Sequence, residues 1–239
     1  MMSRYLPHLT LLFAILFALS PLASDGFNGF KPDQFPVVQE RWPVQPAGWA
    51  FSIWGLIYLW LIAGSAWGLR KASDNPDWQA MRMPLLISLF VGTFWIAAAN
   101  ASPTLATVMI IVMAVAAIIA FLHAGDRQPF WQVGPVGLYA GWLTAATGVA
   151  IAVLLSGYGI MSAGPAAILL ILAVLAVALW VQSRHPAALT YSIAVGWALI
   201  GIVAVNWSAE YRHVALLTAL GIAALAALYL SRGWRARGR

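Results

Sequence analysis

The most distinctive stretch of the sequence is QPAGWAFSIWGLIYLW, residues 45–60, which carries three tryptophans, a phenylalanine and a tyrosine without one charged residue. Indole and phenol rings offer broad apolar surface for stacking, and their N–H and O–H groups form hydrogen bonds at one edge. Residues of this kind suit the binding of a flat lipophilic ligand, and they equally suit the packing of one helix on another. The stretch by itself leaves both interpretations open.

Residues for catalytic or metal chemistry are sparse. The chain has no cysteine, which excludes disulfides, thiolate metal sites and cysteine nucleophiles. Its four histidines form no i, i+4 pair of the kind that indicates a metal or haem site, so we expect neither a metal nor a bound cofactor. His123 and Asp126 are close enough in sequence for an acid–base pair, although the end of a helix explains both. Because no nucleophile elbow or phosphate loop is present, the sequence does not indicate an enzyme.

The composition is typical of a membrane protein. The chain is 62% hydrophobic and 8% charged, whereas soluble domains carry about 25% charged residues. Apolar segments close to the length that spans a bilayer, about 20 residues, recur along the chain. They are 6–23, 48–69, 84–101, 104–123, 134–156, 163–181, 188–206 and 214–231. We therefore predict an all-α fold, a polytopic membrane bundle of about eight transmembrane helices.

Charged residues fall between these segments rather than within them. No Asp, Glu, Lys or Arg is predicted in the middle of a span, which disfavours an ion-coupled pump. The first segment has features of a signal peptide as well as of an anchor. Because residues 22–24 make a poor cleavage site, we favour the uncleaved anchor.

Lysines and arginines are distributed unevenly between the two ends of the predicted bundle. Ten lie at one end: Arg4, Arg70, Lys71, Arg82, Arg127, Arg184, Arg232, Arg235, Arg237 and Arg239. Three lie at the other: Lys31, Arg41 and Arg212. The positive-inside rule then places both termini in the cytoplasm and loop 24–47 outside, as expected for a bacterial inner membrane. The same asymmetry explains the net charge of +6 without nucleic acid as a partner.

The aromatic residues of segment 48–69 form two stripes on a helical wheel drawn at about 100° per residue. The stripe at positions typical of interfacial anchors consists of Trp49, Trp60 and Trp67. The opposite stripe consists of Phe51, Trp54, Tyr58 and Ser65. Since it mixes aromatic surface with hydroxyl groups, we expect this second stripe to face the interior of the bundle. It lines a ligand pocket there or packs on its neighbours, and the wheel does not decide between the two.

At these residues the chain resembles the TspO/MBR family, the tryptophan-rich sensory proteins related to the mitochondrial translocator protein. The family signature Pro-Pro-x-Trp-x-Phe…Trp…Tyr is similar to residues 46–51 followed by Trp54 and Tyr58. Phe30-Lys31-Pro32 is similar to the Lys-Pro of the family's first loop. Residues 139–147 are similar to its fifth-helix motif, and 100–103 are weakly similar to its third-helix motif.

The chain departs from the family pattern at several positions. Ala47 replaces the second proline, Ala145 stands where the family has phenylalanine, and Ala150 stands where it has asparagine. The resemblance covers roughly residues 1–155. It predicts a TspO-like five-helix bundle over 1–156 with loop 24–47 outside, followed by a three-helix extension over 157–239 with a basic cytoplasmic tail.

The resemblance implies a non-enzymatic membrane receptor or carrier, with a tetrapyrrole, a sterol or a similar lipophile bound in a pocket that the first loop closes. A porphyrin or haem would then be the ligand rather than a cofactor. The residues expected to bind it are Trp42, Trp49, Phe51, Trp54, Tyr58, Asn100, Tyr139 and Trp142. Lys31 and Arg41 are candidates to pair with a ligand carboxylate at the mouth.

Two other functions are compatible with the sequence. A small-molecule transporter would use the added helices as a second gate, although no clear inverted repeat is present. A structural or accessory subunit would use its small-residue faces for helix contacts. The Gly64/Gly68 and Gly137/Gly141 pairs have the Gly-xxx-Gly spacing that permits close helix approach, and they also make a homodimer plausible.

Overall fold

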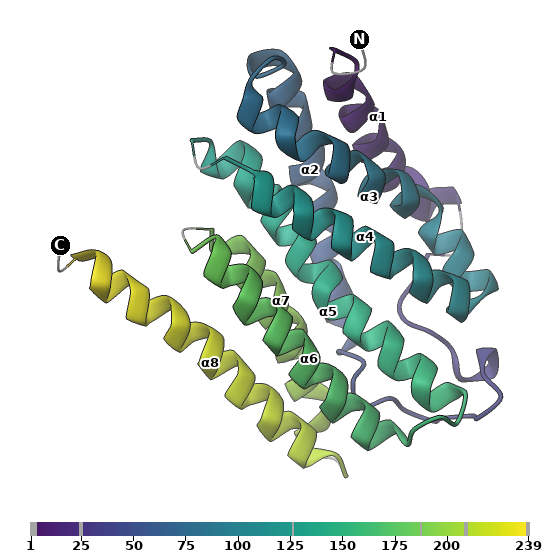
Figure 1. Ribbon diagram of the computed structural model, residues 1–239. Coiled ribbons are helices and arrows are strands. Elements are labelled where there is room, and N and C mark those ends of the chain that lie inside the picture. The colour runs from purple at the N-terminus through teal and green to yellow at the C-terminus, as the bar shows by residue number, and fades with distance from the viewer. Residues whose placement is uncertain (1–3, 24–25, 126, 187, 208–209, 238–239) are drawn as a thin grey trace.

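The computed structural model describes residues 4–23, 26–125, 127–186, 188–207 and 210–237, and within these it contains only helices and connections (Figure 1). The α-helices are α1 Leu6–Leu19, α2 Ile53–Lys71, α3 Pro76–Ala101, α4 Pro103–His123, α5 Gly134–Gly157, α6 Ala163–Arg184, α7 Thr190–Asn206 and α8 Arg212–Arg237. Among the described residues, seven helices are long and apolar enough to cross a membrane, and α7 is a shorter apolar helix. The predicted all-α membrane bundle is confirmed, and the chain is an integral membrane protein.

Helix α3 begins at Pro76, well before the start at residue 84 that hydropathy predicts. The side chain of Asn75 accepts hydrogen bonds from the backbone N–H groups of Asp77 and Trp78, and Pro76 occupies the first helical position. Both are strong signals for a helix start. The first two turns carry polar residues, so a criterion based on apolar runs misses them.

Helix α5 is the central helix of the bundle. It packs against α2, α4, α6 and α7, and every residue from 134 to 145 is buried. Three of its glycines lie where a Cβ atom would collide with a neighbour: Gly137 meets Phe121 and Thr190, Gly141 meets the carbonyl of Tyr191, and Gly148 meets Val174. These absent side chains let α4, α6 and α7 approach the α5 backbone closely.

The glycine pairs that made a homodimer plausible are in contact within the chain. Gly64 faces the carbonyl of Trp131, and Gly68 faces the ring of Trp78. The second pair lies on α5, where Gly137 faces Phe121 and Gly141 faces the carbonyl of Tyr191. A homodimer, if formed, uses other surfaces.

Helix α1 begins and α8 ends at the same end of the bundle, and the long connection between α1 and α2 covers the opposite end (Figure 1). A 3₁₀ turn, Gly48–Ser52, leads from this connection into α2. At the other end, a π turn, Pro129–Val133, leads into α5. The long connection therefore covers the end of the bundle at which α2 begins.

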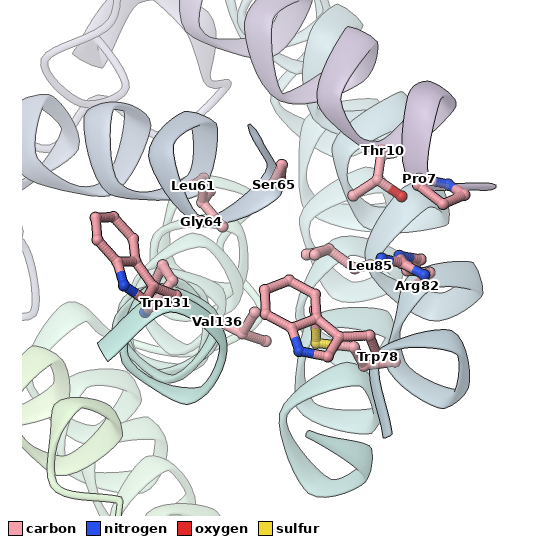
Figure 2. A pocket seen from close by; sticks show the side chains of 12 residues that line it. Pro7, Thr10, Leu61, Gly64, Ser65, Trp78, Arg82, Leu85, Trp131 and Val136 are labelled. Atoms are coloured by element: carbon pink, nitrogen blue, oxygen red, sulfur yellow. The ribbon is translucent and has the colours of Figure 1, made fainter. Parts of the chain in front are cut away.

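Arg82, predicted among the residues of a connection, is instead buried in α3 with 2% of its surface exposed. It lies in a pocket beside Thr10 of α1, with Trp78 next to it and Trp131 across (Figure 2). Its Nη1 donates to the carbonyl of Ser73 at 2.6 Å, and its Nη2 donates to those of Gly68 and Ala72 at 3.0 and 2.9 Å. The guanidinium thus adds hydrogen bonds to three carbonyls at the C-terminal end of α2, and its charge complements the helix dipole.

We predict that Arg82→Ala lowers the free energy of unfolding by about 3 kcal/mol, because it leaves several buried carbonyls without a charged donor. Arg70→Ala, which removes an exposed arginine from the same end of α2, should change it by less than about 0.5 kcal/mol. Titration of detergent-solubilised protein with SDS, followed by circular dichroism, measures both. Equal effects of the two substitutions would contradict the capping role of Arg82.

Candidate functional site

An apolar cavity, which we call the inner pocket, lies between the long connection and the helices that it covers. The space between its lining atoms amounts to about 540 Å³, with the open solvent at its mouth included. The connection contributes Phe27, Gly29, Phe30, Gln45 and Pro46. The helices and the turn before α2 contribute Phe51, Trp54, Trp95, Ile110, Trp142, Ala145, Ala146, Val149, Ala150 and Ala198.

Three aromatic residues predicted to bind ligand meet at this pocket. Phe51 and Trp142 have ring centroids 5.8 Å apart, and Trp54 and Trp142 have centroids 6.1 Å apart, each pair close to perpendicular. Phe51 and Trp54 are three residues apart across the junction of the 3₁₀ turn with α2, so both side chains face α5. Within each pair the edge of one ring meets the face of the other, an arrangement that aromatic pairs favour.

Small side chains of α5 leave the space that makes the pocket. Ala145, Ala146 and Ala150 all line it. Two of these alanines stand at positions where the TspO/MBR pattern has phenylalanine and asparagine. The pocket is consequently wider and less polar along α5 than that pattern implies.

A second hollow, the outer pocket, adjoins the inner pocket and has a volume of about 860 Å³ including open space. The two share the residues Phe27, Phe51, Trp54 and Trp95. The outer pocket also contains the predicted residues Trp49 and Tyr58, and Trp49 is 46% exposed at its rim. Trp54 and Tyr58 stack with centroids 5.2 Å apart. The shared aromatic residues therefore form a wall between the two hollows.

Two polar atoms at the inner pocket are buried without a hydrogen-bond partner among the described residues. They are Oε1 of Gln45 and Nε1 of Trp142, and Trp142 is only 2% exposed. By contrast, Nε1 of Trp95 donates to the carbonyl of Ala106 at 2.9 Å. An unpaired buried polar atom is costly, so it is a natural contact for a ligand or a water molecule. One acceptor and one donor are thus available in an otherwise apolar cavity.

Two of the predicted ligand-binding residues have other partners. Tyr139 is fully buried, and its hydroxyl lies 2.8 Å from Oγ of Ser88, which also bonds the carbonyl of Met113. Asn100 is exposed and donates through Nδ2 to the carbonyl of Gly26 at 3.4 Å. Neither lines the inner or the outer pocket.

The predicted residues of the long connection also lie outside both pockets. Trp42 is buried, and its ring packs on that of Phe35 at 5.5 Å. Lys31 and Arg41 are exposed. Arg41 donates to the carbonyl of Val205 at 3.5 Å and lies 5.6 Å from the ring of Tyr211.

Several residues of the pockets were missed by sequence reasoning. Phe27 and Trp95 are aromatic, but nothing in their local pattern distinguishes them from packing residues. Gln45 belongs to the distinctive stretch 45–60 and is its single amide side chain, a signal that was available. Ala198 carries no local signal, because only the placement of α7 against α5 brings it to the cavity.

Acidic residues and histidines do not gather into a metal site in the described part of the chain. His123 places Nδ1 2.8 Å from the carbonyl of Ile119, one helical turn earlier. Asp126, its suggested acid–base partner, lies outside the described residues. The candidate site that the geometry offers is therefore a hollow built from aromatic rings and a few hydrogen-bonding groups.

Comparison with known proteins agrees with the sequence motifs. A family model described as TSPO-like protein matches residues 9–231. The motifs end at residue 155, whereas the matched range continues through α6 and α7 into α8. No curated protein and no solved structure matches the chain.

We predict that Tyr139→Phe lowers the free energy of unfolding by about 1 kcal/mol, because it removes a buried hydrogen bond and leaves Ser88 with one partner fewer. Tyr158→Phe is the matched control, since that hydroxyl bonds Thr104 at an exposed site. It should change the free energy by less than about 0.5 kcal/mol. Chemical unfolding in detergent compares the two. A neutral Tyr139→Phe would show that the bond to Ser88 contributes nothing.

Proposed function

The chain belongs to the TSPO-like protein family, and we propose that it is a non-enzymatic membrane receptor or carrier for a flat lipophilic ligand of the tetrapyrrole or sterol kind. The observation that supports this most directly is the inner pocket, where Phe51, Trp54 and Trp142 surround a cavity with almost no polar lining. Pockets for small apolar ligands have this character, with a few polar groups that fix orientation.

The polar groups narrow the class of ligand. Trp142 Nε1 can only donate a hydrogen bond, and Gln45 Oε1 can only accept one. A ligand that carries a hydroxyl or carboxyl group beside a broad apolar body satisfies these atoms, and its rings stack on the aromatic wall. Sterols and porphyrins both have this make-up. Lys31, exposed next to the pocket residue Phe30, is proposed to attract a ligand carboxylate towards the mouth.

The outer pocket supports a carrier with a defined entrance. It adjoins the inner pocket across Phe27, Phe51, Trp54 and Trp95, so a ligand that reaches it needs only a rearrangement of these side chains to move inward. With the termini proposed to be cytoplasmic, both pockets lie towards the extracytoplasmic side. The two adjoining pockets are also compatible with a transporter, which is the second candidate function. Flux of ligand across the membrane of proteoliposomes separates a transporter from a receptor.

An accessory subunit without a ligand receives less support. Such a subunit would offer the Gly64/Gly68 and Gly137/Gly141 faces to helices of a partner. In the described residues, these glycines instead contact other parts of the same chain.

We predict that protoporphyrin IX binds purified protein saturably, and that Trp54→Ala weakens binding about tenfold or more, because an aromatic side chain is lost from the wall. Trp180→Ala is the matched control. It also removes one tryptophan, but Trp180 is a half-exposed residue of α6 outside both pockets. The measurement is titration in detergent, followed by the porphyrin absorbance band and by quenching of tryptophan fluorescence.

Ala150→Leu provides a second test of the same site, since it fills the inner pocket from α5 without removing a ring. Saturable binding that is lost in Trp54→Ala and Ala150→Leu and kept in Trp180→Ala supports the proposal for porphyrins. Cholesterol is tested in the same way, by competition. If the affinities of all variants for both porphyrin and cholesterol equal those of the wild-type protein, the inner pocket is not the ligand site.

A further inference from the structure

The second half of the long connection, residues 41–50, is bonded to α7. Nδ2 of Asn206 donates to the carbonyl of Pro43 at 2.7 Å, and Nε1 of Trp197 donates to that of Ala50 at 2.8 Å. Between these two bonds, the backbone N–H of Ala47 donates to the carbonyl of Gly201 at 3.1 Å. These bonds occur over three successive turns of α7, so they hold the segment along the helix rather than at one point.

The fit between this segment and α7 is close. A Cβ atom on Gly201 would lie 2.8 Å from Cβ of Pro46 and 3.0 Å from Cβ of Ala50, both on or beside backbone that has little freedom to move. Asn206 is fully buried and bonds the carbonyl of Ile202 with the same amide nitrogen. The α7 surface is therefore shaped to receive residues 46–50.

The first half of the connection is held by other helices. Nε2 of Gln34 donates to the carbonyl of Ala99 at the end of α3, at 3.0 Å. The N–H of Val37 donates to the carbonyl of Gly157 at the end of α5, at 2.9 Å. Neither bond involves α7, so the two halves of the connection are anchored independently.

The two halves meet over the inner pocket. The amide of Gln45 lies against Gly29, whose φ of +114° is suited to glycine and whose missing side chain leaves the room for that amide. Both residues line the pocket. Within the described residues, no hydrogen bond joins 26–37 to 41–47, so side-chain packing alone closes this junction.

We call residues 43–50 the roof of the inner pocket. We infer that α7 positions this roof: its contacts hold Gln45 and Pro46 over the inner pocket and thereby set ligand affinity. Ala198 of α7, between the bonding residues Trp197 and Gly201, lines the pocket wall, so one helix supplies both wall and support. The inference about affinity rests on the proposed function, whereas the support of the roof can be measured without any ligand.

The test uses a thiol as reporter, because the chain has no cysteine. Val44→Cys is close to isosteric and places a single thiol in the buried part of residues 43–50, where Val44 is 3% exposed. Ala72→Cys, at the other end of the bundle and 7% exposed, reports on global unfolding. The rate of modification by a maleimide is measured for each thiol in detergent.

Gly201→Ala is combined with each reporter, and Gly196→Ala is its matched control. Both are glycine-to-alanine changes on α7, but a Cβ at Gly196 meets nothing within 4 Å. Gly201→Ala should raise the modification rate of the V44C thiol about threefold or more and leave that of the A72C thiol unchanged. Gly196→Ala should change neither. Trp197→Phe, which keeps a ring beside Trp49 and removes the N–H donor, should act in the same direction as Gly201→Ala.

Affinity for protoporphyrin IX is then measured in proteins without the reporter thiols. Weaker binding in Gly201→Ala and Trp197→Phe, with Gly196→Ala like wild type, supports the inference in full. If the V44C thiol is not exposed in either variant, or if both thiols react faster together, α7 does not specifically support the roof and the inference is overturned. If the V44C thiol alone is exposed while wild-type protein binds no porphyrin or cholesterol, the support is upheld and the proposed function fails.

Discussion

Close approach of helices to the α5 backbone is the constraint on which the rest of the structure depends. Because Gly137, Gly141 and Gly148 have no side chains, α4, α6 and α7 pack directly against this helix. The approach of α7 at Gly141 brings Ala198 to the inner pocket and places Gly201 under the long connection. A larger residue at Gly141 would displace α7, and with it both a wall of the pocket and the support of its roof.

The inner pocket combines broad aromatic surface with very little hydrogen-bonding capacity. In the pocket, Nε1 of Trp95 bonds a backbone carbonyl, as the hydroxyl of Tyr139 bonds Ser88 outside it, whereas Nε1 of Trp142 and Oε1 of Gln45 have no partner among the described residues. This division matters for binding, because groups already paired stiffen the frame and unpaired groups remain for the ligand. Rigid aromatic walls also reduce the conformational entropy lost when a flat ligand binds.

The last three helices are integrated with the rest of the bundle through α6 and α7, which both pack on α5. The sequence motifs stop at residue 155, and this boundary makes residues 157–239 look like an appendage. In the structure, α7 lies on α5 and bonds the connection that precedes α2. The family match through residue 231 is in keeping with this integration.

The sequence by itself determined the class of the fold, and it placed several aromatic residues that line the candidate site. Long apolar segments separated by charges require a helical membrane bundle, because backbone polar groups in lipid must be satisfied within helices. The helical period placed Trp54 and Tyr58 on one face, which is local information, and both do line pockets. The motifs also identified Phe51 and Trp142, which meet at the inner pocket.

Only the tertiary structure decided which polar groups are available and what closes the pocket. Tyr139 looked as suited to a ligand as Trp142, yet Ser88, 51 positions earlier, occupies its hydroxyl. Gln45, Trp95 and Ala198 come together from the connection, α3 and α7, and no periodicity within any one segment relates them. The physical reason is that hydrophobic periodicity specifies which face of a helix is buried, whereas hydrogen-bond partners depend on contacts between segments far apart in the chain.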